Sequence, residues 1–276
     1  GLIMAVLVTG AKGMLGQDLC PIFEDAGYEV IETDVDTLDI TNAEQVKQVL
    51  EEYKPEIVIH CAAYTNVDKA EEDLKTAELI NVTGTENIAD ACGKLGITLV
   101  YISTDYVFNG CNTEPYKPDD MPNPINNYGQ TKYEGEEAVR SFCEKYYIAR
   151  TSWLYGHHGK NFVETMISLK DKEVLKVVDD QIGCPTWTVE LANGILKLLN
   201  KPYGTYHVCG SGYTSWYGFA KEIFKQMNLN VNLQPCTTDE FPRPAKRPAY
   251  SVMDNDKICR QWEAALKDYL DLRIEA

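Results

Sequence analysis

A tyrosine and a lysine stand four residues apart in the segment N-N-Y-G-Q-T-K, at Tyr128 and Lys132. On a helix, residues with this spacing share one face, so the Lys132 ammonium can lie beside the Tyr128 phenol. A nearby cation favours the ionised form of a phenol and so lowers its pKa from an ordinary value of about 10. Such a tyrosine could exchange a proton with a carbonyl or alcohol oxygen near neutral pH. Because the chain holds 17 tyrosines, the pair alone indicates little.

A hydroxyl group precedes this pair, at Thr104. It follows an apolar segment over residues 97–103 that predicts a buried strand. In parallel sheets, ligands and reacting groups gather at the carboxyl ends of the strands. We therefore expect Thr104, Tyr128 and Lys132 to form one catalytic group.

A glycine-rich turn, T-G-A-K-G-M-L-G, lies far upstream, between a predicted strand and a predicted helix. This context is the one that a phosphate-binding turn requires. Gly10 permits a sharp turn, Gly13 lets the backbone approach a pyrophosphate, and Gly16 lets the helix and strand pack closely. The amino end of the helix would then hold the anion; an ordinary tight turn is the alternative. The predicted phosphate site contains Gly10, Gly13, Met14, Leu15 and Gly16.

Acidic residues follow the second predicted strand. Asp34 is expected to accept hydrogen bonds from an adenosine ribose, with Asp36 as the alternative. Asp39 and Ile40 come next, where a side chain could reach the adenine. No Arg or Lys follows the strand until Lys47, so nothing obvious would bind a 2'-phosphate, and NADH is favoured over NADPH as the cofactor.

Small residues follow the third predicted strand, in C-A-A-Y-T. A nearly bare backbone would let the two riboses of a dinucleotide lie along the sheet edge. Ala62, Ala63 and Tyr64 are therefore predicted to contact the cofactor. Helix–sheet packing is an equally good reason for small residues here.

Composition limits the classes of partner and compartment. The formal net charge of −16 argues against duplex DNA and anionic membranes, because both would repel such a surface. Nine cysteines without a C-x-x-C pair predict neither a disulfide framework nor a zinc site, so a reducing cytoplasm is expected. No apolar run approaches the length needed to span a bilayer.

The first half of the chain alternates apolar runs with amphipathic stretches. Runs typical of buried strands cover residues 3–9, 28–33, 56–61, 97–103 and 146–150. Helical patterns separate them, over residues 13–26, 41–53 and 77–95 and around Lys132. Thr41 and Glu44 are predicted to cap the second of these helices as a capping box. This alternation indicates an α/β fold with a doubly wound, Rossmann-like parallel sheet covered on both faces.

The rhythm changes past Trp153. Helical patterns over residues 161–169, 189–199, 215–227 and 255–272 alternate with brief strands and with loops rich in proline and glycine. We predict a dinucleotide-binding domain over residues 1–152. Residues 153–276 are predicted to form mainly a smaller α/β substrate lobe without a full core of its own. Some of its segments are expected to return to the first domain.

Taken together, these motifs resemble the extended short-chain dehydrogenase/reductase superfamily and, within it, the dTDP-4-dehydrorhamnose reductase family. The resemblance runs nearly from end to end. It rests on the glycine turn and on A-A-Y-T-N-V-D-K-A-E, S-T-D-Y-V-F, Y-G-Q-T-K, R-T-S-W-L-Y-G, N-F-V-E-T-M, D-Q-I-G-C-P-T and R-P-A-Y-S.

The resemblance implies roles for individual residues. The family reduces the 4-keto group of dTDP-6-deoxy-L-lyxo-4-hexulose to give dTDP-L-rhamnose, with either NADH or NADPH. Tyr128 would protonate the carbonyl oxygen, Lys132 would hold the nicotinamide ribose, and Thr104 would bond the same oxygen. Trp153 would contact the sugar, with Asp105 beside it.

Further expectations concern phosphates, partners and alternatives. Arg247 is expected to pair with the substrate phosphates. For Lys246 in the same loop, phosphate binding and a solvated side chain are equally good interpretations. The resemblance implies a homodimer; no metal ligands are predicted. Two other functions stay open: a nucleotide-sugar epimerase or dehydratase of the same superfamily, and a non-catalytic regulatory subunit of the methionine adenosyltransferase type.

Overall fold

The structure is a computed structural model that describes residues 3–273, and its centre is a six-stranded sheet. All strand pairs in this sheet are parallel. The order of the strands reverses at β1, which lies between β2 and β3. In such sheets this reversal creates a crevice at the carboxyl ends of the strands. Across the sheet, the strands are β10 (Gly204–His207), β5 (Tyr146–Thr151), β4 (Thr98–Thr104), β3 (Ile57–His60), β1 (Ala5–Thr9) and β2 (Glu29–Glu32).

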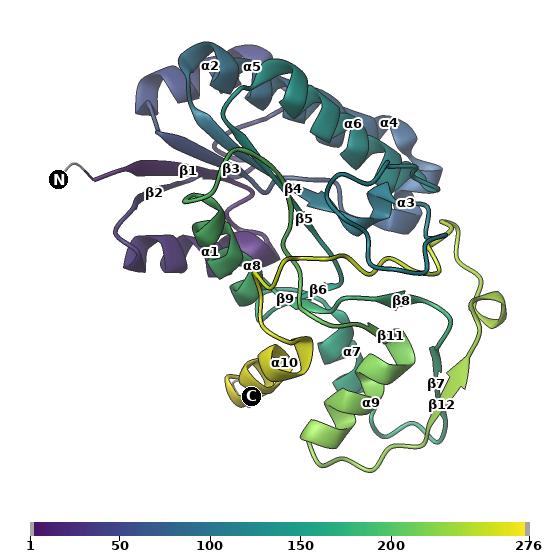
Figure 1. Cartoon of the computed structure of the whole chain (residues 1–276). Coiled ribbons are helices and arrows are strands. Elements are labelled where there is room, and N and C mark those ends of the chain that lie inside the picture. Colours follow the sequence, from purple (N-terminus) through teal and green to yellow (C-terminus); the bar gives the residue numbers. More distant parts are fainter. Residues whose placement is uncertain (1–2, 274–276) are drawn as a thin grey trace.

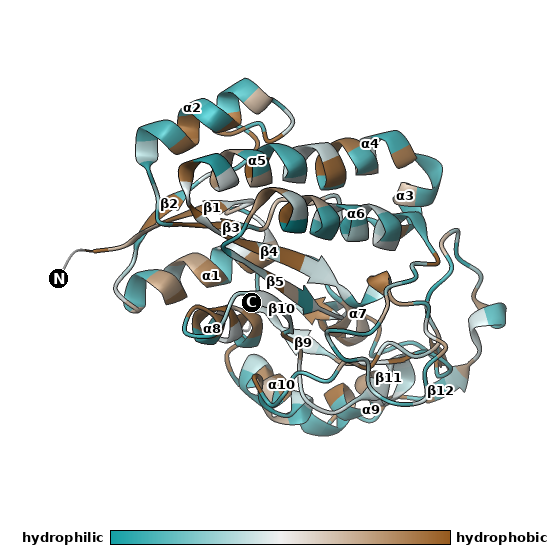
Figure 2. Ribbon diagram, turned by 45° about the horizontal axis from the view of Figure 1, so that its top comes forward, coloured by the Kyte–Doolittle hydropathy of each residue, from teal (hydrophilic) through white to brown (hydrophobic). Residues whose placement is uncertain are grey.

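Helices cover both faces of the sheet, as predicted for a doubly wound fold (Figure 1). One face carries α1 (Met14–Asp25) and α8 (Thr188–Leu198), and the other carries α2 (Ala43–Tyr53), α5 (Thr85–Leu95) and α6 (Asn127–Phe142). Successive strand residues point to opposite faces, so Val58 packs with the second helix group and Ile59 with the first. This burial on both sides explains the continuous apolar strands in Figure 2.

Short helical segments join these layers. They are α3 (Val67–Glu72), α4 (Leu74–Glu78), the π-helical turn η1 (Leu79–Gly84) and the 3₁₀ turn η2 (Asp105–Val107). The predicted helix over residues 77–95 is therefore interrupted by the π turn before α5 begins. The turn places the buried side chain of Asn81 against the backbone of Tyr64 and the hydroxyl of Thr131.

The remaining elements form a lobe beneath the carboxyl edge of the sheet (Figure 1). Its helices are α7 (Phe162–Ser168), α9 (Trp216–Gln226) and α10 (Trp262–Asp271), with the 3₁₀ turn η3 (Thr238–Glu240). Its paired strands are β6 (Leu154–Tyr155) with β9 (Thr186–Trp187), β8 (Ile182–Gly183) with β11 (Thr214–Ser215), and β7 (Leu175–Val178) with β12 (Leu233–Cys236). The expectation that this lobe lacks a full core is wrong. It encloses an aromatic-rich cluster that includes Trp187, Phe219 and Tyr269.

Two local predictions also differ from the structure. Asn42 caps α2, with its side chain accepting from the Gln45 amide, whereas the Thr41 hydroxyl donates to Asp39. The last helix begins at Trp262 rather than at residue 255. The preceding residues Asp256 and Lys257 have φ angles of 50° and 59°, in the left-handed region that cannot continue a helix.

The second half of the chain returns to the sheet. β10 pairs with β5 as an edge strand, and α8 lies beside α1. These segments belong structurally with the first half. The division at residues 152 and 153 stays a prediction.

Candidate active site

A pocket of about 910 Å³ runs along the carboxyl ends of β1 to β5 and reaches the lobe. Most of the predicted site residues line it, although they come from separate parts of the chain. These are Gly10, Gly13, Met14, Leu15, Gly16, Asp34, Asp39, Ile40, Ala62, Ala63, Thr104, Asp105, Tyr128, Lys132 and Trp153. Tyr64 and Arg247 are not among its lining residues.

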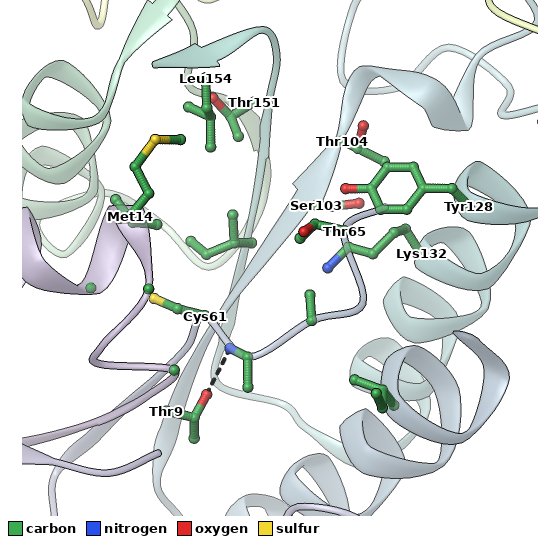
Figure 3. A pocket seen from close by; sticks show the side chains of 18 of the residues that line it. Thr9, Met14, Cys61, Thr65, Ser103, Thr104, Tyr128, Lys132, Thr151 and Leu154 are labelled. Atoms are coloured by element: carbon green, nitrogen blue, oxygen red, sulfur yellow. Dashed lines mark hydrogen bonds between the residues drawn. The ribbon is translucent and has the colours of Figure 1, made fainter. Parts of the chain in front are cut away.

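Tyr128 and Lys132 project from α6 into this pocket, and Thr104 faces them from the end of β4 (Figure 3). Asn126 caps the amino end of α6, because its side chain accepts a hydrogen bond of 2.7 Å from the Gly129 amide. The Asn126 amide group also donates to the Lys246 carbonyl at 2.8 Å. The predicted catalytic group is therefore assembled at the edge of the sheet.

The protonation of Tyr128 differs from the expectation. Burial raises the pKa of the phenol well above its ordinary value, and the charge of Asp105 raises it further, while hydrogen bonding with Thr104 opposes them. The lowered pKa that was expected beside the Lys132 ammonium is therefore not found, because desolvation dominates. Tyr128 is thus held as a protonated phenol, which is the form that can give a proton to a ketone oxygen.

Lys132 is almost fully buried, and burial lowers its pKa to about 8, against the opposing charge of Glu136. Its ammonium nitrogen also lies 4.4 Å from the centre of the Tyr101 ring, a distance that allows a cation–π contact. Lys132 is therefore mostly charged at neutral pH, but its pKa lies only slightly above that pH.

Glu136 is a site-supporting residue that sequence reasoning missed. Its fully buried carboxylate accepts from the Ser103 hydroxyl at 2.6 Å and from the Arg150 guanidinium at 2.8 and 2.9 Å. Arg140 adds a bond of 2.9 Å. These contacts join β5 to β4 and α6, the two elements that carry the predicted catalytic residues. Its position one turn after Lys132 was the available signal.

The glycine turn has the geometry that a phosphate site needs. Gly10 has a φ of 64°, and a Cβ there would lie 2.8 Å from the Ala62 amide nitrogen. A Cβ at Gly16 would lie 2.5 Å from the Gly10 carbonyl oxygen. The N-cap of α1 is Gly13, which provides no side-chain cap. The first amides of the helix are therefore left for an anion.

Lys12, in the glycine turn, lies beside the acidic residues that follow β2, where the sequence suggested no cation for a 2'-phosphate. The Asp34 carboxylate accepts from the Lys12 amide at 2.9 Å, and the exposed Lys12 ammonium lies 2.8 Å from Asp36. Both Lys12 and Asp34 line the pocket. The lysine was overlooked because it precedes the second strand by about twenty residues and comes beside it only in space.

The end of β3 is organised by buried polar contacts. Thr9 accepts from the Ala62 amide at 3.1 Å (Figure 3) and contacts the His60 ring nitrogen at 2.7 Å. Thr85 contacts the other ring nitrogen of His60 at 3.2 Å. Burial lowers the pKa of His60 to about 3, so the ring is neutral and structural.

Two tryptophans form the lobe side of the pocket. The Trp153 and Trp216 rings stack with centres 3.6 Å apart, and both residues line the pocket. Trp216 also donates to Gln181 at 3.1 Å, while Trp153 has a left-handed φ of 48°. An aromatic side chain held in this conformation is costly and is often found at functional sites. The sequence indicated Trp153 but not Trp216.

Arg247 does not line the pocket and forms an ion pair with Asp68 on α3. Its guanidinium is 2.5 Å from the Asp68 carboxylate, which also accepts from Arg243 at 2.8 Å. Hydrogen bonding with Arg247 also opposes the rise that burial causes in the pKa of Tyr106, a pocket residue. The structure therefore places Arg247 next to the site, with its charge already shared with Asp68.

Two kinds of structural feature are absent from residues 3–273. Within this range, no three His, Cys, Asp or Glu side chains gather as a metal-binding cluster. None of the helices in the same range is both long and apolar enough to cross a bilayer.

Comparisons with known proteins agree with this geometry. The family model described as RmlD substrate binding domain matches residues 4–273. A crystal structure of a dTDP-4-dehydrorhamnose reductase from Clostridium acetobutylicum ATCC 824 is 49% identical, with a TM-score of 0.95 over 98% of this chain and 99% of that one.

Two other relatives are similar over nearly their whole length. The dTDP-4-dehydrorhamnose reductase of Bacillus anthracis str. Ames, solved in complex with NADP, is 45% identical with a TM-score of 0.95 over 99% of this chain and 100% of that one. The spore coat polysaccharide biosynthesis protein SpsK of Bacillus subtilis (strain 168) is 44% identical over 98% of both chains. The chain therefore belongs to the dTDP-4-dehydrorhamnose reductase family.

Proposed function

We propose that this protein is an NAD(P)H-dependent reductase that converts the 4-keto group of dTDP-6-deoxy-L-lyxo-4-hexulose to the alcohol of dTDP-L-rhamnose. The observation that carries the proposal is a half-buried, protonated Tyr128 beside Thr104 and Lys132, at the sheet edge that also holds the glycine turn. Membership of the reductase family supports the same substrate.

The residues of the chain perform the acid half of the reaction. A nicotinamide dinucleotide, when bound, supplies the hydride; Gly10, Gly13 and the uncapped start of α1 fit its pyrophosphate. Tyr128 gives its phenolic proton to the ketone oxygen. Lys132 then stabilises the phenolate by its charge, and Thr104 holds the oxygen in reach. The largely apolar lining of the pocket strengthens these interactions.

The direct test is turnover of the purified protein alone, measured as NADH oxidation on addition of the 4-keto sugar nucleotide. A panel of 4-keto sugar nucleotides would identify the base and sugar. A folded, cofactor-binding protein that turns over none of them defeats the proposal. Product analysis should show the 4-hydroxy sugar.

Two alternatives make different predictions about the cofactor. An epimerase or dehydratase of the superfamily retains NAD through its catalytic cycle, whereas a reductase must exchange cofactor at each turnover. Cofactor that stays with the protein through purification would therefore favour the epimerase or dehydratase. A regulatory subunit would be silent without its partner, but the complete set of Thr104, Tyr128 and Lys132 speaks for catalysis.

For the cofactor, we propose NADH as the preferred donor, with NADPH also accepted. Asp34 is available to a ribose diol, which favours NADH, whereas Lys12 offers a cation to a 2'-phosphate. Asp34→Ala should weaken NADH binding more than NADPH binding, and Lys12→Ala should do the reverse. Lys47→Ala, an exposed lysine on α2, is the control. Equal effects on both cofactors would remove these assignments.

Assembly and location are proposed as a homodimer in the cytoplasm. The nine cysteines, all free thiols, suit a reducing compartment. Light scattering after size-exclusion chromatography would give the oligomeric state; a mass of one chain at micromolar concentration would contradict the dimer.

A further inference from the structure

Asp105 is a buried carboxylic acid at the edge of the catalytic group. It is 3% exposed and follows Thr104 directly at the end of β4. One carboxyl oxygen, Oδ1, lies 3.1 Å from the Thr104 hydroxyl. The other, Oδ2, accepts from the Ser251 hydroxyl at 2.6 Å. Both oxygens are therefore occupied by hydroxyl groups of the protein.

The Ser251 contact links the site to the end of the motif that begins at Arg247. Ser251 ends R-P-A-Y-S and is separated from Asp105 by 146 positions in the chain. Its side chain is 2% exposed, so the bond is shielded from water. A buried hydroxyl that donates to Oδ2 leaves Oδ1 as the oxygen on which a proton can sit, facing Thr104.

The Thr104 hydroxyl has a limited number of hydrogen bonds to distribute. It has one proton to donate and two lone pairs that accept. The Tyr106 amide already donates to it at 3.1 Å. If Asp105 is ionised, the only proton of Thr104 points to Oδ1, and the second lone pair is left for the Tyr128 hydroxyl, with which Thr104 also hydrogen-bonds. If Asp105 is protonated on Oδ1, it donates to the second lone pair of Thr104, whose own proton is then free.

We propose, building on the function proposed above, that Asp105 is a positioning residue. Ser251 fixes the orientation of its carboxyl group, and the protonated carboxyl then turns the Thr104 hydroxyl toward the ketone oxygen of the substrate. Thr104 and Tyr128 then both donate to that oxygen as charge develops on it. When Asp105 loses its proton, Thr104 turns back and the ketone oxygen loses one donor. Asp105 itself does not touch the reacting atoms.

The surroundings of Asp105 keep a large fraction of its carboxyl protonated up to about pH 7. Burial raises the pKa of the carboxyl to about 7, while hydrogen bonds from Ser251 and Thr104 oppose that rise. The titratable groups that face it are Tyr128 from α6, Tyr106 from η2 and Cys209 after β10. Among residues 3–273, no ion pair includes Asp105.

The sign of the pH effect follows from this assignment. The active form is protonated, so activity is present below the pKa of Asp105 and declines as pH rises through about 7. Between about pH 6 and about pH 8, loss of this proton should lower kcat/KM about tenfold. Lys132, whose pKa is about 8, adds a further loss of about twofold over the same range.

The test compares pH profiles of kcat/KM for wild type and Asp105→Asn. Asparagine is neutral at every pH, and its amide can donate to Thr104 while its oxygen accepts from Ser251. At about pH 6, we expect the kcat/KM of Asp105→Asn to stay within about threefold of the wild-type value. The decline centred near pH 7 should disappear, and only the decline caused by Lys132 near pH 8 should remain. Asp119→Asn, which removes an exposed carboxylate, should reproduce the wild-type profile. An Asp105→Asn profile identical to wild type overturns the proposal.

A second variant covers the possibility that Asp105→Asn folds poorly. Because the Ser251 hydrogen bond lowers the pKa of Asp105, Ser251→Ala should move the midpoint of the decline to higher pH; a midpoint that does not move also overturns the proposal. Infrared difference spectra between wild type and Asp105→Asn should show the carbonyl stretch of a protonated acid at about pH 6. This readout needs no substrate, so it separates an error about Asp105 from an error about the proposed reaction.

Discussion

Replacing Glu136 with Gln should affect both the stability of the protein and the charge of Lys132. The Glu136 carboxylate is fully buried, and its partner Arg150 is 1% exposed. A glutamine side chain would preserve the shape and one acceptor oxygen, but it would leave the Arg150 guanidinium without a counter-ion in the interior.

The size of the stability loss follows from that burial. Burial would raise the pKa of Glu136, but the bonds and charge of Arg150, with Ser103 and Arg140, outweigh it and hold the pKa below its ordinary value. Removing one member of a buried ion pair costs about 3 to 5 kcal/mol. We expect a loss of about 3 kcal/mol for Glu136→Gln, since one acceptor remains. At about 2 to 4 °C per kcal/mol, Tm should fall by about 6 to 12 °C.

The catalytic effect has a definite sign. Glu136 raises the pKa of Lys132 against the lowering caused by burial, and the result is about 8. Without this charge the pKa of Lys132 falls further, so Lys132 loses its proton at lower pH. The loss of kcat on the alkaline side should therefore move toward neutral pH in Glu136→Gln.

The assays are thermal unfolding by circular dichroism and kcat measured against pH. Glu137→Gln is a matched control, because Glu137 is the neighbouring residue on α6 and pairs with Arg140 while 53% exposed. Exposed pairs contribute about 0 to 1 kcal/mol. If the two variants lose the same stability, the buried pair does not hold the site together. An unchanged pH profile in Glu136→Gln would refute its effect on Lys132.

Two further substitutions test the pocket itself. Tyr128→Phe should lower kcat by about 10² to 10⁴ because the general acid is lost, whereas the Kd for NADH, measured by fluorescence titration, should stay within about twofold; unchanged turnover would exclude Tyr128 as the acid. Gly183→Ala should raise KM for the sugar nucleotide, because the new Cβ would lie 2.5 Å from the Trp153 ring and must displace it from Trp216. Steady-state kinetics and tryptophan fluorescence would detect the displacement, and an unaltered KM with an unaltered spectrum would speak against it.

Much of the fold could be predicted from the sequence because its signals are local. A strand buried on both faces must be apolar at every position, as β3 is over Ile57–Ile59, and a turn before a helix shows its glycines directly. The order of Thr104, Tyr128 and Lys132 along the chain also indicated the catalytic group. These features depend on residues that are close together in the chain, so they are visible in the sequence pattern.

Errors arose where distant segments or desolvation decide the outcome. The cation beside Asp36 is Lys12, because parallel packing of β1 and β2 brings the two turns together. The pKa of Tyr128 rises, because burial and the charge of Asp105 disfavour the phenolate. Neither effect has a signature in local spacing.

The sequence by itself determined the type of fold, the glycine turn and the candidate for the catalytic acid, through periodicities of two and 3.6 residues and short motifs. Only the tertiary structure decided which groups support that acid. Ser251 reaches Asp105 across 146 positions, and Arg150 from β5 reaches Glu136 on α6. The reason is physical: the protonation of these groups depends on exclusion of water, and water is excluded only when all the layers have packed.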